Sequence, residues 1–102
     1  MTLAEVKNML EESGIPVAYR RAKQGTKVPF ITWKAKKDNM SADDVVYHSF
    51  HDIEVWLYTT RKDLKLEDKL ETIFKNHGIY WSQDDSDLDD ENVMITIYTM
   101  EV

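Results

Sequence analysis

The chain has 102 residues, of which 42% are apolar and 11% aromatic, which is enough for one hydrophobic core but not for two. Its formal net charge of −6 disfavours tight binding to nucleic acid, which needs cations to displace phosphate counterions. Because there is no cysteine, disulfide bonds, thiolate catalysis and cysteine-based zinc sites are excluded. No apolar run reaches the ~18 residues of a membrane-spanning helix, and the polar, acidic N-terminus does not resemble a secretory signal. We therefore expect a single soluble domain over residues 1–102, made in the cytoplasm.

The first predicted element is a short helix that begins after Thr2. Thr2 and Glu5 have the spacing of a capping box, in which each side chain accepts a hydrogen bond from the other residue's backbone N–H. Gly14 suits the left-handed position that follows a helix, and Pro16 prevents the helix from resuming. One face of this helix is expected to pack on the rest of the domain, and it consists of Leu3, Val6, Met9 and Leu10.

Two strands and two loops are predicted next. Val17–Arg20 can form a short strand, and Val28–Lys34 a longer one, whose Pro29 indicates an edge position or a bulge. Between them, the polar segment Arg21–Lys27 is predicted to be a hairpin loop. Lys36–Asp44 lacks a hydrophobic period and is predicted to be a second loop. Because both loops are polar and flank strong strands, we expect them to be mobile in the free protein.

The strongest signal in the chain is a long strand, Val45–Thr60, whose side chains alternate in character. Its apolar face carries Ile53, Val55 and Leu57. Its opposite face carries Glu54, Trp56 and Tyr58. A small domain rarely leaves large aromatic side chains on a bare sheet face, so we expect a helix or a partner chain to cover this second face.

A second helix is predicted after Asp63, which can serve as its N-cap. The helix ends at Gly78, and His77 complements the helix dipole in the last turn. Its apolar stripe consists of Leu66, Leu70, Ile73 and Phe74. We expect this stripe to face the apolar side of the long strand, so that Leu70 is buried.

Two further strands are predicted after this helix. One begins at Ile79–Ser82, an aspartate-rich loop then spans Gln83–Asn92, and the final strand spans Val93–Val102. The resulting order, α-β-β-β-α-β-β, indicates an α+β domain with an antiparallel or mixed sheet.

Positive and negative side chains are segregated along the chain. Between residues 20 and 37 there are seven cations and no acid, namely Arg20, Arg21, Lys23, Lys27, Lys34, Lys36 and Lys37. From residue 84 onward there are seven acids and no cation, namely Asp84, Asp85, Asp87, Asp89, Asp90, Glu91 and Glu101. These segments are either solvated loops or surfaces that attract each other, within one chain or between neighbouring copies. Exposed ion pairs contribute only about 0–1 kcal/mol each, so charge alone does not decide between the two interpretations.

The acidic segment does not have the spacing of a calcium site. Asp85, Asp87 and Asp89 match the first ligand positions of an EF-hand loop. However, Asp90 stands where that loop needs a glycine, and Thr96 stands where it needs a bidentate glutamate. A solvated acidic loop is therefore favoured over a calcium site.

His48, His51 and Asp52 are also close in sequence, as metal ligands often are. On a strand, residues three apart point to opposite faces, and His48 and Asp52, which share a face, lie about 13 Å apart. They cannot bind one ion without a bulge. We expect no metal ligands in this chain.

No enzymatic motif is present. The chain lacks a G-x-S-x-G nucleophile motif and, with only three glycines, any phosphate-binding glycine-rich loop. We therefore expect no catalytic or cofactor-binding residues, no cofactor and no enzymatic activity. Tyr19, Phe30 and Trp33 are interleaved with cations as on a nucleic-acid-binding face, but the net charge disfavours this function, and some of these rings must fill the core.

The overall pattern resembles the tail-completion, or head–tail joining, proteins of long-tailed phages and prophages of Gram-positive bacteria. The resemblance covers nearly the whole chain and is carried by the segments PVAYR, IEVWLYT with its charged turn, and the terminal YTMEV. It implies a tail-terminator-like domain that forms a ring, commonly a hexamer, at the head-proximal end of the tail. The ring would stop growth of the tail tube, bind the tube protein and the head connector, and let DNA pass non-specifically through its lumen. It also implies a location in the virion, after assembly in the host cytoplasm, and no membrane partner.

A ring needs two different patches that meet on neighbouring copies. We expect the oppositely charged segments and the aromatic strand to supply these patches, and the two predicted loops to become ordered on assembly. The expected interface residues are Arg20, Arg21, Lys23, Lys27, Trp56, Tyr58, Asp84, Asp85, Asp87 and Asp89. The alternative function is that of a small acidic regulatory or inhibitor protein that binds one host protein.

Overall fold

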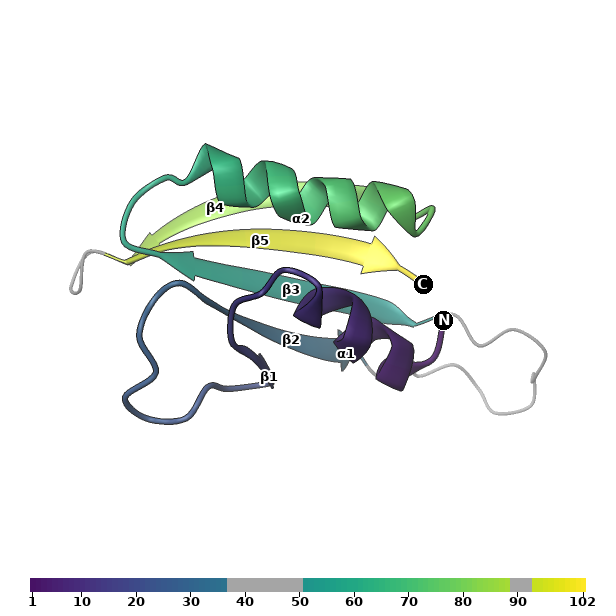
Figure 1. Ribbon diagram of the computed structural model, residues 1–102, viewed down its shortest axis with the longest axis horizontal. Coiled ribbons are helices and arrows are strands. Elements are labelled where there is room, and N and C mark those ends of the chain that lie inside the picture. The colour runs from purple at the N-terminus through teal and green to yellow at the C-terminus, as the bar shows by residue number, and fades with distance from the viewer. Residues whose placement is uncertain (37–50, 89–92) are drawn as a thin grey trace.

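The computed structural model describes residues 1–36, 51–88 and 93–102 of the chain (Figure 1). Its helices and strands follow the predicted order and form an α+β domain with one five-stranded sheet, in the strand order β1-β2-β3-β5-β4. Neighbouring strands are antiparallel except for β1 and β2, which are parallel, so the sheet is mixed. The elements are α1 (Leu3–Glu11), β1 (Val17–Tyr19), β2 (Phe30–Lys36), β3 (Asp52–Thr59), α2 (Leu64–Asn76), β4 (Trp81–Leu88) and β5 (Val93–Glu101).

Helix α1 begins with the predicted capping box. The Thr2 backbone N–H donates to Glu5 Oε1 at 2.7 Å, and the Glu5 backbone N–H donates to Thr2 Oγ1 at 3.1 Å. The Thr2 backbone N–H bonded to the Glu5 carboxylate lowers the pKa of Glu5. Val6, Met9 and Leu10 are buried in the core, as predicted, whereas Leu3 is 37% exposed and does not belong to the buried stripe.

The prediction that Arg21–Lys27 is a hairpin loop was wrong. β1 and β2 are parallel, with Val17 opposite Ile31 and Tyr19 opposite Trp33, so the connection must return along the length of β1 before β2 begins. The composition of a loop cannot distinguish a hairpin from a connection between parallel strands, because the direction of a strand pair depends on long-range pairing. β2 also starts two residues later than predicted and extends to Lys36.

Strand β3 has the predicted alternation. Ile53, Val55 and Leu57 are fully buried on one side, while Glu54, Trp56 and Tyr58 are partly exposed on the other. β3 lies in the middle of the sheet, paired with β2 on one side and with β5 on the other. The predicted extension of this strand over residues 45–50 lies outside the described residues, as does most of the predicted loop Lys36–Asp44.

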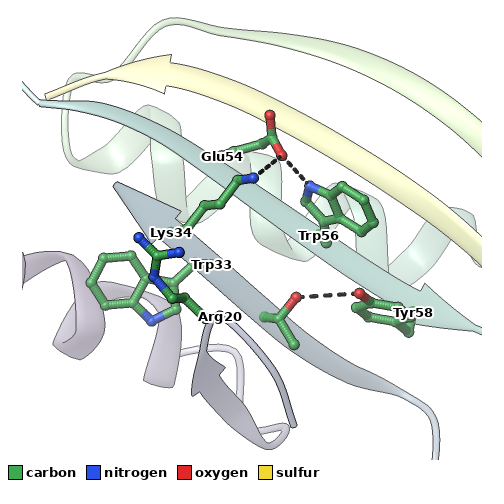
Figure 2. A pocket seen from close by; sticks show the side chains of 7 residues that line it. Arg20, Trp33, Lys34, Glu54, Trp56 and Tyr58 are labelled. Atoms are coloured by element: carbon green, nitrogen blue, oxygen red, sulfur yellow. Dashed lines mark hydrogen bonds and ion pairs between the residues drawn. The ribbon is translucent and has the colours of Figure 1, made fainter. Parts of the chain in front are cut away.

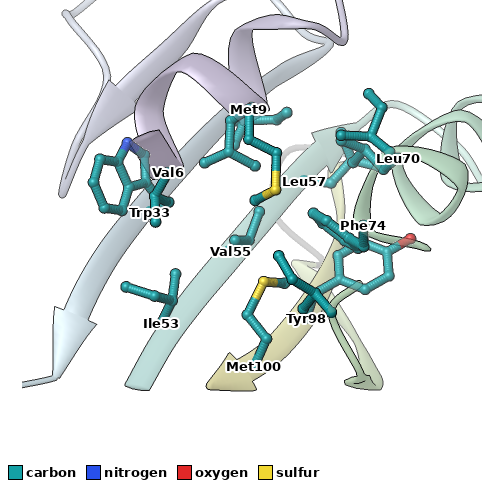
Figure 3. Close-up of a cluster of buried hydrophobic side chains, with 14 residues drawn as sticks. Val6, Met9, Trp33, Ile53, Val55, Leu57, Leu70, Phe74, Tyr98 and Met100 are labelled. Atoms are coloured by element: carbon teal, nitrogen blue, oxygen red, sulfur yellow. The ribbon is translucent and has the colours of Figure 1, made fainter. Parts of the chain in front are cut away.

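Helix α2 also matches its prediction. Asp63 is the N-cap, and its Oδ1 accepts a hydrogen bond from the Leu66 backbone N–H at 3.1 Å. Gly78, just beyond the helix, has a φ of 73°, the left-handed conformation that glycine adopts without strain. Leu70 and Phe74 are fully buried, and they share one core cluster with the apolar face of β3 and with α1 (Figure 3). Both helices therefore cover the same face of the sheet.

The prediction of a loop over Gln83–Asn92 was wrong in its first part. β4 continues through this segment to Leu88, and its residues pair one to one with β5, from Trp81 opposite Met100 to Leu88 opposite Val93. Aspartate disfavours strands because of its local hydrogen bonding. At a sheet edge, however, its carboxylate stays solvated while the backbone pairs on one side. Residues 89–92 lie outside the described part of the chain.

Candidate interaction surface

The sheet face opposite the helices carries a band of aromatic and aliphatic side chains, which we call the open face. Phe30 lies opposite Tyr58 across β2 and β3, and their rings stack with centroids 4.4 Å apart. On the neighbouring strand β5, Ile95 and Ile97 lie opposite Tyr58 and Trp56. In the described parts of the chain, no helix or strand packs on this face. The predicted aromatic face of the long strand is therefore confirmed, but both helices cover the other side.

A polar cluster orients Trp56 on the open face. The Trp56 Nε1–H donates to Glu54 Oε1 at 2.6 Å, and the Lys34 ammonium group lies 3.8 Å from the same carboxylate (Figure 2). The Lys36 ammonium group lies 3.9 Å from it. The Glu54 side chain is only 17% exposed. The indole ring is therefore held in one position before any partner arrives, which lowers the entropy cost of binding.

Beside this cluster the open face has a shallow hollow of about 130 Å³ (Figure 2). Its lining residues are Arg20, Thr32, Trp33, Lys34, Glu54, Trp56 and Tyr58. Sites for drug-sized ligands usually enclose about 300–1,000 Å³. This hollow is therefore smaller than a usual site for a drug-sized ligand.

The basic side chains gather at one edge of the sheet, beside β1. Arg20, Arg21, Lys23 and Lys27 are all exposed, and none of them belongs to an ion pair among the described residues. Arg20 has a φ of 72°, and its guanidinium carbon lies 5.6 Å from the centre of the Tyr19 ring. We call this surface, β1 with the following residues 20–27, the basic edge.

The acidic side chains of β4 lie at the opposite edge of the sheet, which we call the acidic edge. Asp84 and Asp85 are both exposed there. Four strand spacings, or about 19 Å, separate β4 from β1. This exceeds the screening length of ~8 Å at physiological ionic strength, so the two edges attract each other little within one chain.

Of these two aspartates, only Asp85 has a side-chain partner among the described residues. The Lys62 Nζ donates to Asp85 Oδ2 at 3.0 Å and lies 3.2 Å from Glu67 Oε2, while the Gln83 side-chain N–H donates to Glu67 Oε1 at 2.9 Å. The hydrogen bond to Asp85, together with the contact to Glu67, raises the pKa of Lys62. Asp85 was predicted to be an interface residue. Within the chain its carboxylate binds Lys62, which precedes α2, and this contact ties the start of α2 to β4. This leaves Asp84 as the exposed acid with no partner among the described residues.

The sequence interpretation missed this polar cluster of Lys62, Glu67, Gln83 and Asp85. A signal was present, because Glu67 lies three residues before Leu70 and seven before Phe74, and so falls within the buried stripe of α2. A carboxylate in such a stripe needs polar partners.

A second partly buried polar contact joins α2 to the sheet. The Tyr98 hydroxyl donates to Glu71 Oε2 at 3.3 Å, and burial raises the pKa of Tyr98.

The remaining predicted interface residues, and the residues that were weighed and rejected as metal ligands, lie as follows. Asp87 lies on β4, whereas Asp89 and His48 lie outside the described residues. Asp52 lies at the start of β3, and the backbone of His51 pairs with that of Val102. Within residues 1–36, 51–88 and 93–102, no three histidine or carboxylate side chains are grouped as metal ligands.

Neither helix in the described segments is long and apolar enough to cross a membrane. Comparison of the chain with protein-family models and with curated proteins finds no match.

Proposed function

We propose that this protein is a structural component of phage tail assembly, which forms a ring at the head-proximal end of the tail and joins the tail tube to the head connector. The observation that carries the proposal is the open face, where Phe30, Trp56 and Tyr58 lie on a sheet that no described helix covers. Together with the sequence resemblance to tail-completion proteins, this favours assembly over catalysis.

The composition of the open face is that of an interface core. Tryptophan, tyrosine and phenylalanine are enriched at the centres of protein interfaces, because they bury a large area with few rotatable bonds. The Trp56 ring is already fixed by Glu54, so little side-chain entropy is lost on binding. We assign this face to contacts with neighbouring copies and with the tail tube or connector protein.

The charge of the chain fits passage of DNA through the ring. A lumen that conducts DNA should not hold its phosphates strongly, and a chain with a net charge of −6 avoids such attraction. No cofactor is needed for a role of this kind.

The oligomeric state tests the proposal. Native mass spectrometry and negative-stain electron microscopy of the purified protein should show a closed ring whose mass is a whole multiple of 12.0 kDa, alone or on isolated tail tubes. On tubes, the protein should cap one end only. A protein that stays monomeric at all concentrations and does not bind tubes would contradict the proposal and favour the regulatory alternative.

A further inference from the structure

We propose that copies of this chain associate head to tail through the edges of their sheets, with the acidic edge of one copy docking on the basic edge of the next. This inference rests on the proposed function, because it assumes self-assembly, and it deepens it by naming the two surfaces that meet. The docking strand is β4, and the strand that it meets on the neighbouring copy is β1, which ends the sheet on the other side and is flanked by the cations of residues 20–27.

Strand β4 is built to accept another segment. It is eight residues long and, among the described strands, pairs with β5 alone. Its register with β5 is continuous, so no bulge twists the edge away, and its sequence contains no proline. Its aspartates disfavour pairing with another acidic edge but not with a basic one. Its outer backbone N–H and C=O groups have no strand partner among the described residues, so they can bond to the outer backbone groups of β1 in the next copy and extend the sheet across the contact, as in β-augmentation.

Charge selects which segment docks there. Two β4 edges would bring Asp84 of each copy together, and two basic edges would bring Arg20 and Arg21 together, so pairing of like edges is disfavoured. Pairing of unlike edges places exposed cations against exposed carboxylates. The segment 20–27 has four such cations and no acid. A second copy of the chain is thus the partner that the surface charges fit.

The strand order makes such association directional. β1 and β4 lie at opposite ends of the sheet, so each copy offers its acidic edge to one neighbour and its basic edge to the other (Figure 1). Repeated contacts of this heterologous kind close into a ring when the rotation between copies allows it.

Cysteine cross-linking tests this geometry directly, because the natural chain has no cysteine. A variant with Lys23→Cys and Asp84→Cys, both at exposed positions, should form a ladder of covalent multimers under mild oxidation and lose the ladder on reduction. The matched control carries Lys23→Cys and Leu64→Cys, since Leu64 is 63% exposed but belongs to α2, which covers a face of the sheet and is part of neither edge. The control should give no ladder.

The outcomes separate this inference from the proposed function. If native mass spectrometry shows the wild-type assembly but the Lys23–Asp84 variant gives no more cross-linking than the control, the edge contact is wrong and the proposed function stands. If the wild-type chain does not assemble at all, both are wrong.

A second measurement uses charge reversal and needs no cross-link. Arg21→Glu with Lys23→Glu cancels the net charge of residues 20–27, because Arg20 and Lys27 remain, and Asp84→Lys reduces the negative charge of β4. Each variant alone should assemble more slowly than wild type at low salt. An equal mixture of the two should recover part of the wild-type rate, because alternating copies restore the wild-type edge pair at every second contact. Wild-type rates for each variant alone would overturn the inference.

Discussion

Leu70→Ala is the most direct test of how the two helices and the sheet are held together. Leu70 is fully buried and belongs to the same core cluster as Leu57 on β3 and Met9 on α1. Truncation of a fully buried leucine costs about 2–5 kcal/mol, because the cavity collapses only partly. Since this site is enclosed by both helices and the sheet, we expect about 3–4 kcal/mol, within the 2–5 kcal/mol range. The corresponding fall in Tm for a domain of this size is roughly 12–30 °C.

Urea denaturation and differential scanning calorimetry would measure this loss, with an unchanged denaturant slope as evidence that the unfolded states are alike. Leu64→Ala is the matched control, because Leu64 is on the same helix but 63% exposed, and we expect a change within about 0.5 kcal/mol. If the two variants lose similar stability, or if Leu70→Ala loses less than about 1 kcal/mol, the packing of α2 described above is wrong.

Four further outcomes are expected. Lys62→Met should lower the free energy of unfolding by about 1–3 kcal/mol in urea titrations, because it removes the ammonium group that pairs with the buried Glu67 carboxylate and donates to Asp85; an equal loss in the exposed control Lys65→Met would contradict this. Because the pKa of Glu5 is lowered in the folded state, its contribution is present at neutral pH and is lost as the pH falls through that lowered pKa. The Tm difference between wild type and Glu5→Gln should therefore shrink in acid, and a difference independent of pH would refute the assignment. Trp56→Ser should weaken self-association in sedimentation velocity while leaving far-UV circular dichroism unchanged, and unaltered association would exclude the open face from the interface. In hydrogen exchange of the free protein, amides of residues 21–27 should exchange quickly apart from those bonded within the loop, such as Thr26, and strong protection throughout would show that the loop is rigid before assembly.

The parts of the fold that were predicted correctly are those in which burial imposes a period on the sequence. The alternation in β3 and the stripe in α2 both indicate which side faces the core, and the capping residues Thr2 and Asp63 indicate where the helices begin. These signals are local, so a single sequence contains them.

The errors concern features that depend on distant partners. β4 has a loop-like composition and forms a strand because its backbone hydrogen-bonds to that of β5. The parallel pairing of β1 with β2 has no local signature in the sequence. In the candidate surface, too, the local pattern could be predicted and the long-range contact could not. The aromatic face of β3 was predicted, but the use of Asp85 by Lys62 depends on a contact between residues far apart in sequence.

The position of β5 has a consequence for folding during synthesis. It follows every other strand in the chain, yet it lies between β3 and β4. Until residues 93–101 have left the ribosome, β3 has a neighbour on one side only and β4 has none. The nascent chain can form α2 and the β2–β3 pair early, but the sheet closes only when its last strand arrives. Until then the apolar side of β3 is incompletely covered, and this is when the chain is most exposed to aggregation.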